Sequence, residues 1–425
     1  MLIEFRVRNY RSFCEEQVLR LGATRITDFP ENIAFSRVAG QNLLKTIAVY
    51  GANSSGKSNL LKAMGMMKDI IFTSFQLRSN EEIPFDPFLL DEESGVSPTG
   101  YEIIFATETK TYRYGFEHDR KTFVKEWLFD QTDGADEPLF VRIDDGIEVF
   151  RDAFPEGEDL ESKTRPNALF LSVVDQFDGR IASEIILWLN GFNAIDGLGH
   201  DDYRAVTFNM LDDETSKNRL IEFYKDLDLG FDDVVVEKKP FDPTRLPFKA
   251  PPELVAQMTT DLEGRMMASL SAVHRVSGPG KTSRDVRFNI RTQESSGTNK
   301  VIDLSGPIFD TLRSGGTLII DELDAKLHPN LTVAIVKLFQ LEETNPSNAQ
   351  LIFATHNTNI LSQGRLRRDQ IIFAEKDEKA STRIYPLVNY KLDNRKVRKD
   401  NSYEKDYLMG RYGGVPFIQD LTNLN

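Results

Sequence analysis

Alternating and helically spaced apolar positions predict the first elements of the chain. Residues 2–8 (LIEFRVR) alternate between apolar and charged side chains, which is typical of a strand, and residues 18–23 are the expected partner strand. Residues 45–50 are a short apolar run that ends at a glycine, which predicts a buried strand. Residues 59–72 then place apolar side chains at helical spacing. The order is therefore strand, glycine loop and helix.

The β pattern continues beyond this helix. Two alternating runs within residues 100–119 predict a hairpin, and the segments KEWLFDQ and EPLFVRIDD extend it. Residues 1–150 are thus expected to form one α/β lobe with an antiparallel flank. From residue 151 to 285 the pattern changes, and RIASEIILWLNGFNAI and ETSKNRLIEFYKDLDLG predict amphipathic helices, the second with a Thr-Ser cap signal. The proline-rich KPFDPTRLPFKAPPE is typical of a linker, so we interpret this stretch as a mainly helical insertion.

Residues 286–375 return to alternating strands and helices. VRFNI, TLIIDE and QLIFATHN are expected strands, and NKVIDLSGPIFDTLRSG and LTVAIVKLFQLEE are the helices between them. Such alternation predicts a parallel sheet and a second α/β lobe. Residues 376–425 form an expected C-terminal tail that contacts a partner. The predicted fold class is α/β.

Composition limits the class of protein and the cell compartment that fit this fold. The chain has 425 residues, 40% hydrophobic and 28% charged, which is ordinary for a globular protein. No apolar run approaches the roughly 20 residues of a membrane helix, so no membrane association is expected. Cys14 is the single cysteine, which excludes an intrachain disulfide and favours a reducing cytoplasm.

The charge balance argues against a protein coated in positive charge. The net charge is −14, which disfavours extensive nucleic-acid binding. Two basic clusters stand out locally: Arg365, Arg367 and Arg368, and Arg395, Lys396, Arg398 and Lys399. They are either solvated surface charge or a contact with a nucleic acid or partner.

The glycine loop matches a phosphate-binding motif, with Gly51, Gly56, Lys57 and Ser58 at the required spacing. Its glycines allow backbone N–H groups to surround a phosphate at the start of the following helix. Lys57 is expected to reach the β- and γ-phosphates, and the Ser58 hydroxyl to ligate Mg²⁺. The residues predicted to contact the nucleotide here are Gly51, Ala52, Asn53, Ser54, Ser55, Gly56, Lys57, Ser58 and Asn59.

Two later strands end in candidate catalytic groups. TLIIDE ends in Asp321, expected to hold Mg²⁺, and Glu322, expected to polarise the attacking water as general base. QLIFATHN ends near His356, about thirty residues later. A histidine at a strand end is often structural, but a neutral ring here can bond both the γ-phosphate and the water.

The segment Glu294–Thr298 (ESSGT) precedes an expected helix. Ser295 and Gly297 would place hydroxyl and N–H groups at a helix N-terminus, where anions bind. The alternative is an ordinary loop with a helix cap.

Together these motifs resemble the ATP-binding-cassette ATPase heads of the SMC, RecF and OLD class. The resemblance rests on the phosphate loop, SSGT, IIDELDAKLHP, ATHN and the opening MLIEFRVRNYRSF, and covers residues 1–115 and 286–375. It implies that SSGT replaces the signature sequence, that Glu322 is the catalytic glutamate and that His356 is the switch histidine. It also implies that Asp324 begins a segment at a dimer interface and that Arg11 is a basic residue near the nucleotide. No clear glutamine loop is present, and residues 87–91 are expected in that region.

Within the class, PFDPFLLDEES, the missing coiled coil and the tail NSYEKDYLMGRYGGVPF resemble the RloA-like AAA15/AAA21-type ATPases of bacterial defence systems. The resemblance implies ATP and Mg²⁺ as cofactors, an ATP-dependent homodimer or higher oligomer, and a nuclease or Toprim-like effector as partner. The main functional hypothesis is a regulatory ATPase of anti-phage defence. A RecF-like DNA-binding repair ATPase is the alternative, and a transport ATPase subunit is a third option that the long insertion disfavours.

Overall fold

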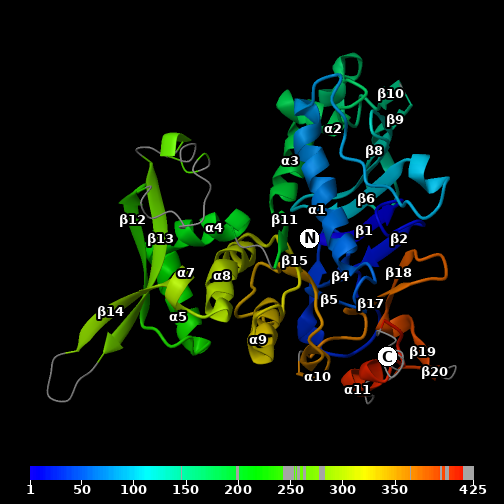
Figure 1. Cartoon of the computed structure of the whole chain (residues 1–425). Helices are drawn as coiled ribbons and strands as arrows, with labels where there is room; N and C mark the ends of the chain where they lie inside the picture. The colour runs from blue at the N-terminus through cyan, green and yellow to red at the C-terminus, as the bar shows by residue number, and fades with distance from the viewer. Residues whose placement is uncertain are drawn as a thin grey trace. The chain divides into compact units, whose positions relative to one another are not determined.

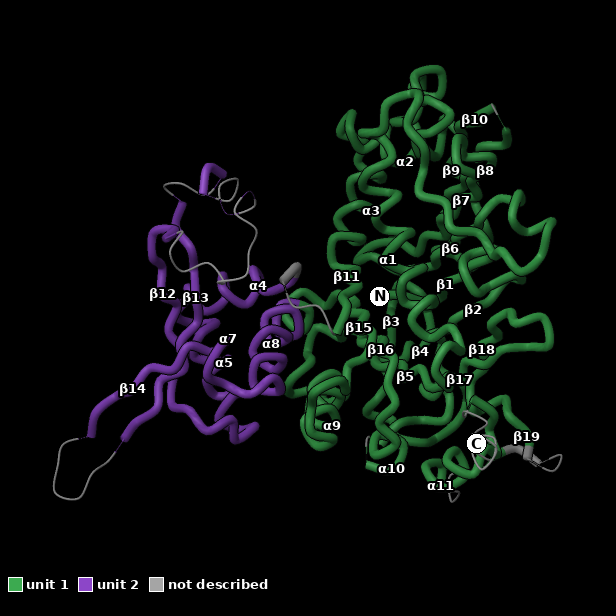
Figure 2. Tube along the Cα trace, viewed as in Figure 1, with its two compact units in different colours: residues 1–198, 311–425 green, residues 199–310 purple. Residues whose placement is uncertain are grey.

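The computed structural model describes residues 1–144, 146–197, 201–242, 253, 255, 259–261, 265–276, 283–363, 365–392, 395–397 and 402–414. It divides the chain into two compact units (Figure 2). Unit 1 comprises residues 1–198 and 311–425, and unit 2 comprises residues 199–310. These boundaries differ from the expected boundaries at residues 150 and 285, because residues 151–197 pack with unit 1 and residues 286–310 pack with unit 2.

A six-stranded sheet of order β11-β15-β16-β5-β17-β18 carries the nucleotide motifs in unit 1 (Figure 1). Its strands are β5 (Thr46–Tyr50), β11 (Phe192–Asp196), β15 (Thr317–Asp321), β16 (Gln350–Ala354), β17 (Ile371–Lys376) and β18 (Thr382–Pro386). All neighbours are parallel except β17 and β18. The expected parallel sheet is present.

An antiparallel sheet of order β10-β9-β8-β7-β6-β1-β2 forms the flank. Its strands are β1 (Leu2–Arg8), β2 (Gln17–Arg20), β6 (Thr99–Ala106), β7 (Thr111–His118), β8 (Phe123–Asp130), β9 (Glu137–Ile143) and β10 (Gly146–Val149). The predicted pairing of the first two strands and the predicted hairpin are confirmed. Two short ribbons accompany this sheet in unit 1, β3 (Ile33–Ser36) with β4 (Gln41–Leu44) and β19 (Lys391–Leu392) with β20 (Arg395–Lys396).

Helix α1 (Lys57–Thr73) lies between the two sheets of unit 1. It contacts β11, β15 and β16 on one side and β1 on the other. Its apolar positions are buried in a core that both sheets share, and the helix begins directly after Gly56 of the phosphate loop. The other helices of unit 1 are α2 (Phe170–Gln176), α3 (Arg180–Asn190), α9 (Pro329–Gln340), α10 (Asn359–Gln363) and α11 (Tyr403–Leu408). The predicted α/β class with an antiparallel flank is confirmed.

The segment at residues 180–195 differs from the single helix expected. Helix α3 ends at Asn190, and the chain then enters β11, which pairs in parallel with the acidic strand β15. The Gly191 carbonyl accepts a hydrogen bond from Thr317 N–H at 2.8 Å, so pairing with β15 overrides the helical pattern at this point.

Unit 2 combines helices with a three-stranded antiparallel sheet of β12 (Asp233–Pro240), β13 (Met266–Val276) and β14 (Arg284–Asn289). The described helices of this unit include α4 (Asp201–Asp212), α5 (Glu214–Asp226), α7 (Ile290–Gln293) and α8 (Ser296–Ser314), whose last residues pass into unit 1. The cap of α5 is Asp213, whose side chain accepts from Ser216 N–H, and not the Thr-Ser pair. The expected proline-rich linker lies mostly outside the described residues.

Candidate functional site

The phosphate loop connects β5 to α1 and depends on glycine at its end. Gly56 caps α1 with φ of 103°, a conformation that L side chains rarely adopt. A Cβ at Gly56 would lie 2.1 Å from Oγ1 of Thr382 and 2.9 Å from Oγ of Ser12. A Cβ at Gly51 would lie 2.4 Å from the carbonyl oxygen of Ala374. Both positions therefore require glycine on steric grounds.

The remaining loop residues differ in exposure. Asn53 and Ser54 are exposed, Ala52, Ser58 and Asn59 are half-buried, and Ser55 and Lys57 are buried. Ser54 has φ of 64°, so the loop leaves regular backbone geometry at its tip.

Lys57 folds back over the loop. Its Nζ donates to the carbonyl oxygens of Gly51 at 2.8 Å and Ala52 at 3.0 Å. Burial lowers the pKa of Lys57, and the charges of three carboxylates oppose that shift, those of Asp321, Glu322 and Asp324. The structure therefore brings the lysine of the loop and the acidic residues after β15 into one electrostatic environment.

Asp321 and Glu322 lie where β15 ends. Asp321 has a buried Oδ1 without a hydrogen-bond partner, which is the kind of orphaned acceptor that a cation can satisfy. Glu322 follows with φ of 50°. Backbone strain of this kind collects at functional sites.

The side chains present fit a magnesium ion bound together with phosphate. Mg²⁺ in such sites takes one or two protein ligands and completes its shell with phosphate oxygens and water. Asp321 and Ser58, the second residue of α1, supply a carboxylate and a hydroxyl of the required kind. No group of three or more His, Cys, Asp or Glu side chains forms a metal cluster among the described residues.

His356 lies just after β16 and is exposed. Its backbone N–H donates to the carboxylate of Asp324 at 3.3 and 3.4 Å, which ties this segment to the acidic segment. Although the residue is exposed, partial desolvation of its ring lowers the pKa of His356, and the positive charge of Lys57 lowers it further. The carboxylates of Asp324, Glu322 and Asp321 oppose both effects. The net shift favours the neutral ring at neutral pH.

Arg11 lies beside the acidic strand but is engaged with another residue. Its guanidinium donates to Oδ2 of Asp86 at 2.9 and 3.1 Å, and its backbone N–H donates to the Asp86 carbonyl. Arg11 and Asp321 line the same cavity of about 230 Å³. Phe88 N–H donates to Oδ1 of Asn9, so the segment expected in place of a glutamine loop packs against the opening segment of the chain.

Ser295 and Gly297 belong to unit 2, at the start of α8. Ser295 Oγ accepts from Thr298 N–H at 3.1 Å, so its hydroxyl caps the helix. Oε1 of Glu294 accepts a hydrogen bond from Nε2 of His274 at 2.9 Å, and this bond holds the segment against β13. Ser295 therefore forms the helix cap that was the alternative interpretation of this segment. A contact of Ser295 or Gly297 with phosphate stays a prediction.

Several residues that contact the loop carry no sequence motif. The Thr382 hydroxyl donates to the Ser55 carbonyl at 2.9 Å and accepts from the Ser12 hydroxyl, whose Oγ lies 2.9 Å from Thr382 Oγ1. Asn59 donates to the same Ser12 hydroxyl at 2.8 Å. Gly197 N–H donates to the Asp321 carbonyl at 2.8 Å, where a Cβ on Gly197 would collide with that oxygen. Isolated serine, threonine and glycine residues are too common to reveal such roles from sequence.

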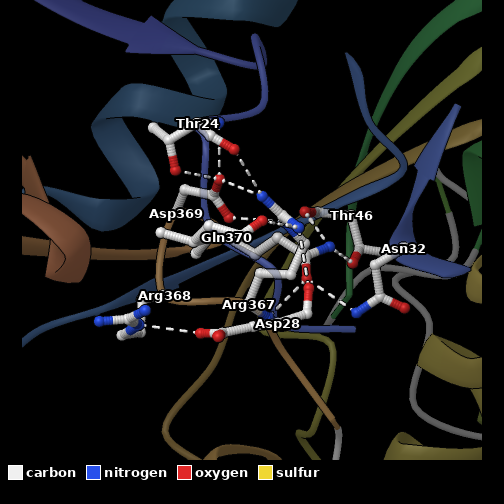
Figure 3. Close-up of polar contacts among 9 residues, drawn as sticks. Thr24, Asp28, Asn32, Thr46, Arg367, Arg368, Asp369 and Gln370 are labelled. Atoms are coloured by element: carbon white, nitrogen blue, oxygen red, sulfur yellow. Dashed lines mark hydrogen bonds and ion pairs between the residues drawn. The ribbon is translucent and has the colours of Figure 1, made fainter. Parts of the chain in front are cut away.

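Arg367 of the first basic cluster lies at the centre of a buried polar network (Figure 3). Arg367 is fully buried and forms a bidentate pair with Asp369 at 2.8 and 2.9 Å. It also donates to backbone carbonyls of Thr24 and Asp28. Arg368 pairs with the Asp28 carboxylate at 2.8 Å, and Arg365, which is exposed, pairs with Glu31.

Neither expected reading of this cluster, solvated charge or partner contact, therefore applies to Arg367. In the second cluster, Arg398 and Lys399 lie outside the described residues, and Arg395 and Lys396 form β20.

Comparison with known families finds one match. The model of the family described as "AAA domain, putative AbiEii toxin, Type IV TA system" matches residues 47–362. This span begins inside β5 and includes the phosphate loop, the acidic pair and His356. No curated protein matches the sequence of the chain.

Three of the solved structures that resemble this chain are aligned with it over most of their own length. An SMC head domain from Thermotoga maritima shares 14% identity with a TM-score of 0.38, covering 91% of this chain and 98% of its own. An Smc head domain from Pyrococcus furiosus, with an extended coiled coil and bound to the C-terminal domain of ScpA, shares 10% with a TM-score of 0.35, covering 90% and 95%. The recombination mediator protein RecF with ATP shares 12% with a TM-score of 0.31, covering 84% and 93%. Among the described residues, no helix has the length and apolar character needed to cross a bilayer.

Proposed function

The chain belongs to the AAA-domain family matched over residues 47–362, and we propose that it binds ATP with Mg²⁺, dimerises around the nucleotide and hydrolyses it to control a partner effector. The observation that carries this proposal is the meeting of three motifs at one sheet edge. Gly51, Glu322 and His356 follow β5, β15 and β16, which are parallel neighbours. The carboxyl ends of parallel strands form the usual ligand site of such sheets.

Each group has a chemical task that its geometry supports. Loop N–H groups and Lys57 would bind the phosphates, and Asp321 with Ser58 would hold the ion that neutralises their charge. Glu322 would accept the proton of the attacking water as general base, and its charge acts on Lys57 of the phosphate loop. The neutral ring of His356 would hold that water or the γ-phosphate by hydrogen bonds.

The proposed dimer rests on the division of the motifs between units. The phosphate loop lies in unit 1, and Ser295 and Gly297 lie in unit 2. We propose that these two residues of one protomer approach the ATP held by the other, with Asp324 near the contact. The single phosphate-loop motif in the chain supports this arrangement, because a second site requires a second copy.

The partner is proposed to be a nuclease or Toprim-like effector of a defence system in the cytoplasm. The family description names a toxin–antitoxin system, which agrees with a protein that acts through a partner. The alternative is a RecF-like DNA-binding ATPase. Arg367 of the first basic cluster cannot contact DNA in this structure, because it is buried in an ion pair with Asp369. ATP-dependent and salt-dependent DNA binding by the purified protein alone would favour that alternative.

Two substitutions test the ATPase and the dimer. Glu322→Gln should keep ATP binding, lower turnover by about 10²- to 10⁴-fold and accumulate an ATP-bound dimer, because the general base is removed. Lys57→Ala should lose ATP binding and dimer formation. Turnover is measured by phosphate release and mass by light scattering with and without MgATP. Full activity of Lys57→Ala rejects the site, and absence of a dimer in Glu322→Gln with ATP rejects the dimer.

A further inference from the structure

The C-terminal helix α11 contacts the candidate site from a part of the chain that no nucleotide motif covers. It lies in unit 1 and packs beside α10, the helix that follows the His356 segment (Figure 1). Chain ends are poorly ordered unless specific contacts hold them. The contacts that hold α11 are made with the two segments that the proposed chemistry requires.

The first contact joins Tyr407 to the phosphate loop. Burial raises the pKa of Tyr407, and the backbone N–H of Gly51 opposes this shift. The hydroxyl also donates to the Gly414 carbonyl at 3.3 Å. A Cβ on Gly414 would lie 3.4 Å from Cα of Gly51, so the backbone at Gly414 packs directly on the phosphate loop.

Aromatic rings fix the position of Tyr407. Its ring stacks on Phe373 of β17 with centroids 5.5 Å apart and meets Tyr50 of β5 edge-on at 5.6 Å. These strands flank the start of the loop. The Tyr407 ring is therefore held beside the start of the loop by Tyr50 and Phe373, and its hydroxyl holds the Gly414 carbonyl.

The second contact joins the same helix to the histidine segment. Thr358 lies two residues after His356, and its Oγ1 donates to Oε1 of Glu404 at 2.9 Å. Tyr50 donates to the Asn357 carbonyl at 3.0 Å, so the segment between them is held from two sides. Glu404 and Tyr407 are three residues apart in α11, a spacing that puts both on one face of a helix.

We propose that Glu404 and Tyr407 are positioning residues for the ATP site, a role that rests on the proposed function. Through them, α11 braces the phosphate loop and the His356 segment against each other. A movement of the C-terminal segment would then change nucleotide affinity and turnover together, which is a direct route from a partner bound at the tail to the site. Neither residue touches the reacting atoms.

The two contacts predict different kinetic effects. Loss of the Thr358–Glu404 hydrogen bond loosens His356, which acts in the transition state, and should lower kcat about tenfold with little change in KM. Loss of the Tyr407 hydroxyl loosens Gly51 and should raise KM and the Kd for MgATP about three- to tenfold with a smaller change in kcat. A purely structural role would not separate kcat from KM in this way.

The experiment compares Glu404→Ala, Thr358→Val and their double variant with Tyr407→Phe, which keeps the ring and removes the hydroxyl. Thr358→Ser retains the hydroxyl and should restore kcat. The double variant should be no worse than either single variant, because both remove the same bond. Lys405→Ala, an exposed position on the same helix, is the matched control and should match wild type in kcat, KM and the Kd of a fluorescent ATP analogue.

Hydrogen exchange without nucleotide separates this inference from the proposed function. Tyr407→Phe should speed exchange in residues 47–56, and Glu404→Ala should speed it in residues 355–359. If wild type fails to bind ATP, the proposed function fails, while faster exchange in these segments still supports the bracing. If exchange and kinetic constants of all these variants equal those of Lys405→Ala, the inference is overturned.

Discussion

Three residues at the candidate site have backbone conformations that most side chains avoid. Gly56 has φ of 103°, Ser54 has φ of 64° and Glu322 has φ of 50°. Each such conformation in a residue with a Cβ costs of order 1–3 kcal/mol and persists only where the surrounding structure imposes it. Here the parallel sheet and α1 impose it, and the loop and Glu322 are thereby preorganised for a ligand.

Gly56→Ala is predicted to destabilise the protein and to abolish ATP binding. The new Cβ would collide with the Thr382 side chain, which is itself hydrogen-bonded to Ser55 and Ser12. We expect a loss of about 2–4 kcal/mol in the free energy of unfolding, from strain plus overpacking. Urea unfolding and ATP-analogue titration measure the two effects.

Gly40→Ala is the matched control for Gly56→Ala. Gly40 has φ of 62°, but no atom lies within 4 Å of the position of its Cβ. It should therefore lose only about 1 kcal/mol, the cost of the backbone conformation, and keep ATP binding. Equal losses in the two variants would show that Thr382 does not confine the loop.

At the scale of elements, the antiparallel flank contains an aromatic enclosure around His118 at the end of β7. Rings of Phe85, Tyr101, Phe116 and Phe123 lie within 6.0 Å of the imidazole centroid. Nδ1 of His118 is 2.9 Å from the Asp119 carbonyl oxygen. Burial lowers the pKa of His118 to about 4, so the folded protein holds it neutral.

The stability of the protein is predicted to fall with acid because of this histidine. Unfolded His118 binds a proton below its ordinary pKa of about 6.5, whereas the folded protein resists protonation until about pH 4. Its contribution is therefore present above pH 6.5 and is lost as pH falls, by about 2 kcal/mol between pH 7 and pH 5. Urea unfolding at both pH values measures this slope.

His118→Phe should reduce the slope by that amount, because phenylalanine does not titrate and matches the surrounding rings. His328→Asn serves as control: it removes an exposed histidine and retains an acceptor for the cap of α9. An unchanged slope in His118→Phe would contradict the assignment.

At the scale of the whole molecule, the predicted motifs divide between two compact units. The phosphate loop, acidic pair and His356 lie in unit 1, while Ser295 and Gly297 begin α8 in unit 2. A composite site shared by two protomers makes a prediction that a site within one chain does not. Two variants with different defects should complement each other.

Mixing Lys57→Ala with Ser295→Asp is predicted to restore ATPase activity. Aspartate still caps α8, so the helix is retained while the added negative charge repels phosphate. Each variant alone should be inactive, but a mixed dimer combines both defects in one site and leaves the other intact. Equal mixing should give at most about half of wild-type activity, because each mixed dimer has one intact site of two. A mixture no more active than its parents would argue against sites shared between protomers.

The sequence by itself determined the elements that carry the motifs and the α/β class of the fold. The strands at residues 46–50, 317–321 and 350–354 are short, strongly apolar and followed by polar motif residues, so local pattern was sufficient to predict them. The roles of Lys57, Asp321, Glu322 and His356 remain predictions that the geometry supports. Their proximity followed from the rule that parallel strands present their carboxyl ends at one edge.

Only the tertiary structure decided what surrounds these motifs. Residues 192–196 form a strand because β15 offers a pairing edge, and Arg367 is buried because Asp369 and distant carbonyls satisfy it. Tyr407 and Thr382 reach the loop across more than 300 residues of chain. Such contacts depend on how the whole core packs, so no local pattern encodes them. Residues close together in the sequence thus make up each motif, whereas the side chains that hold the motifs in place are brought there by the fold.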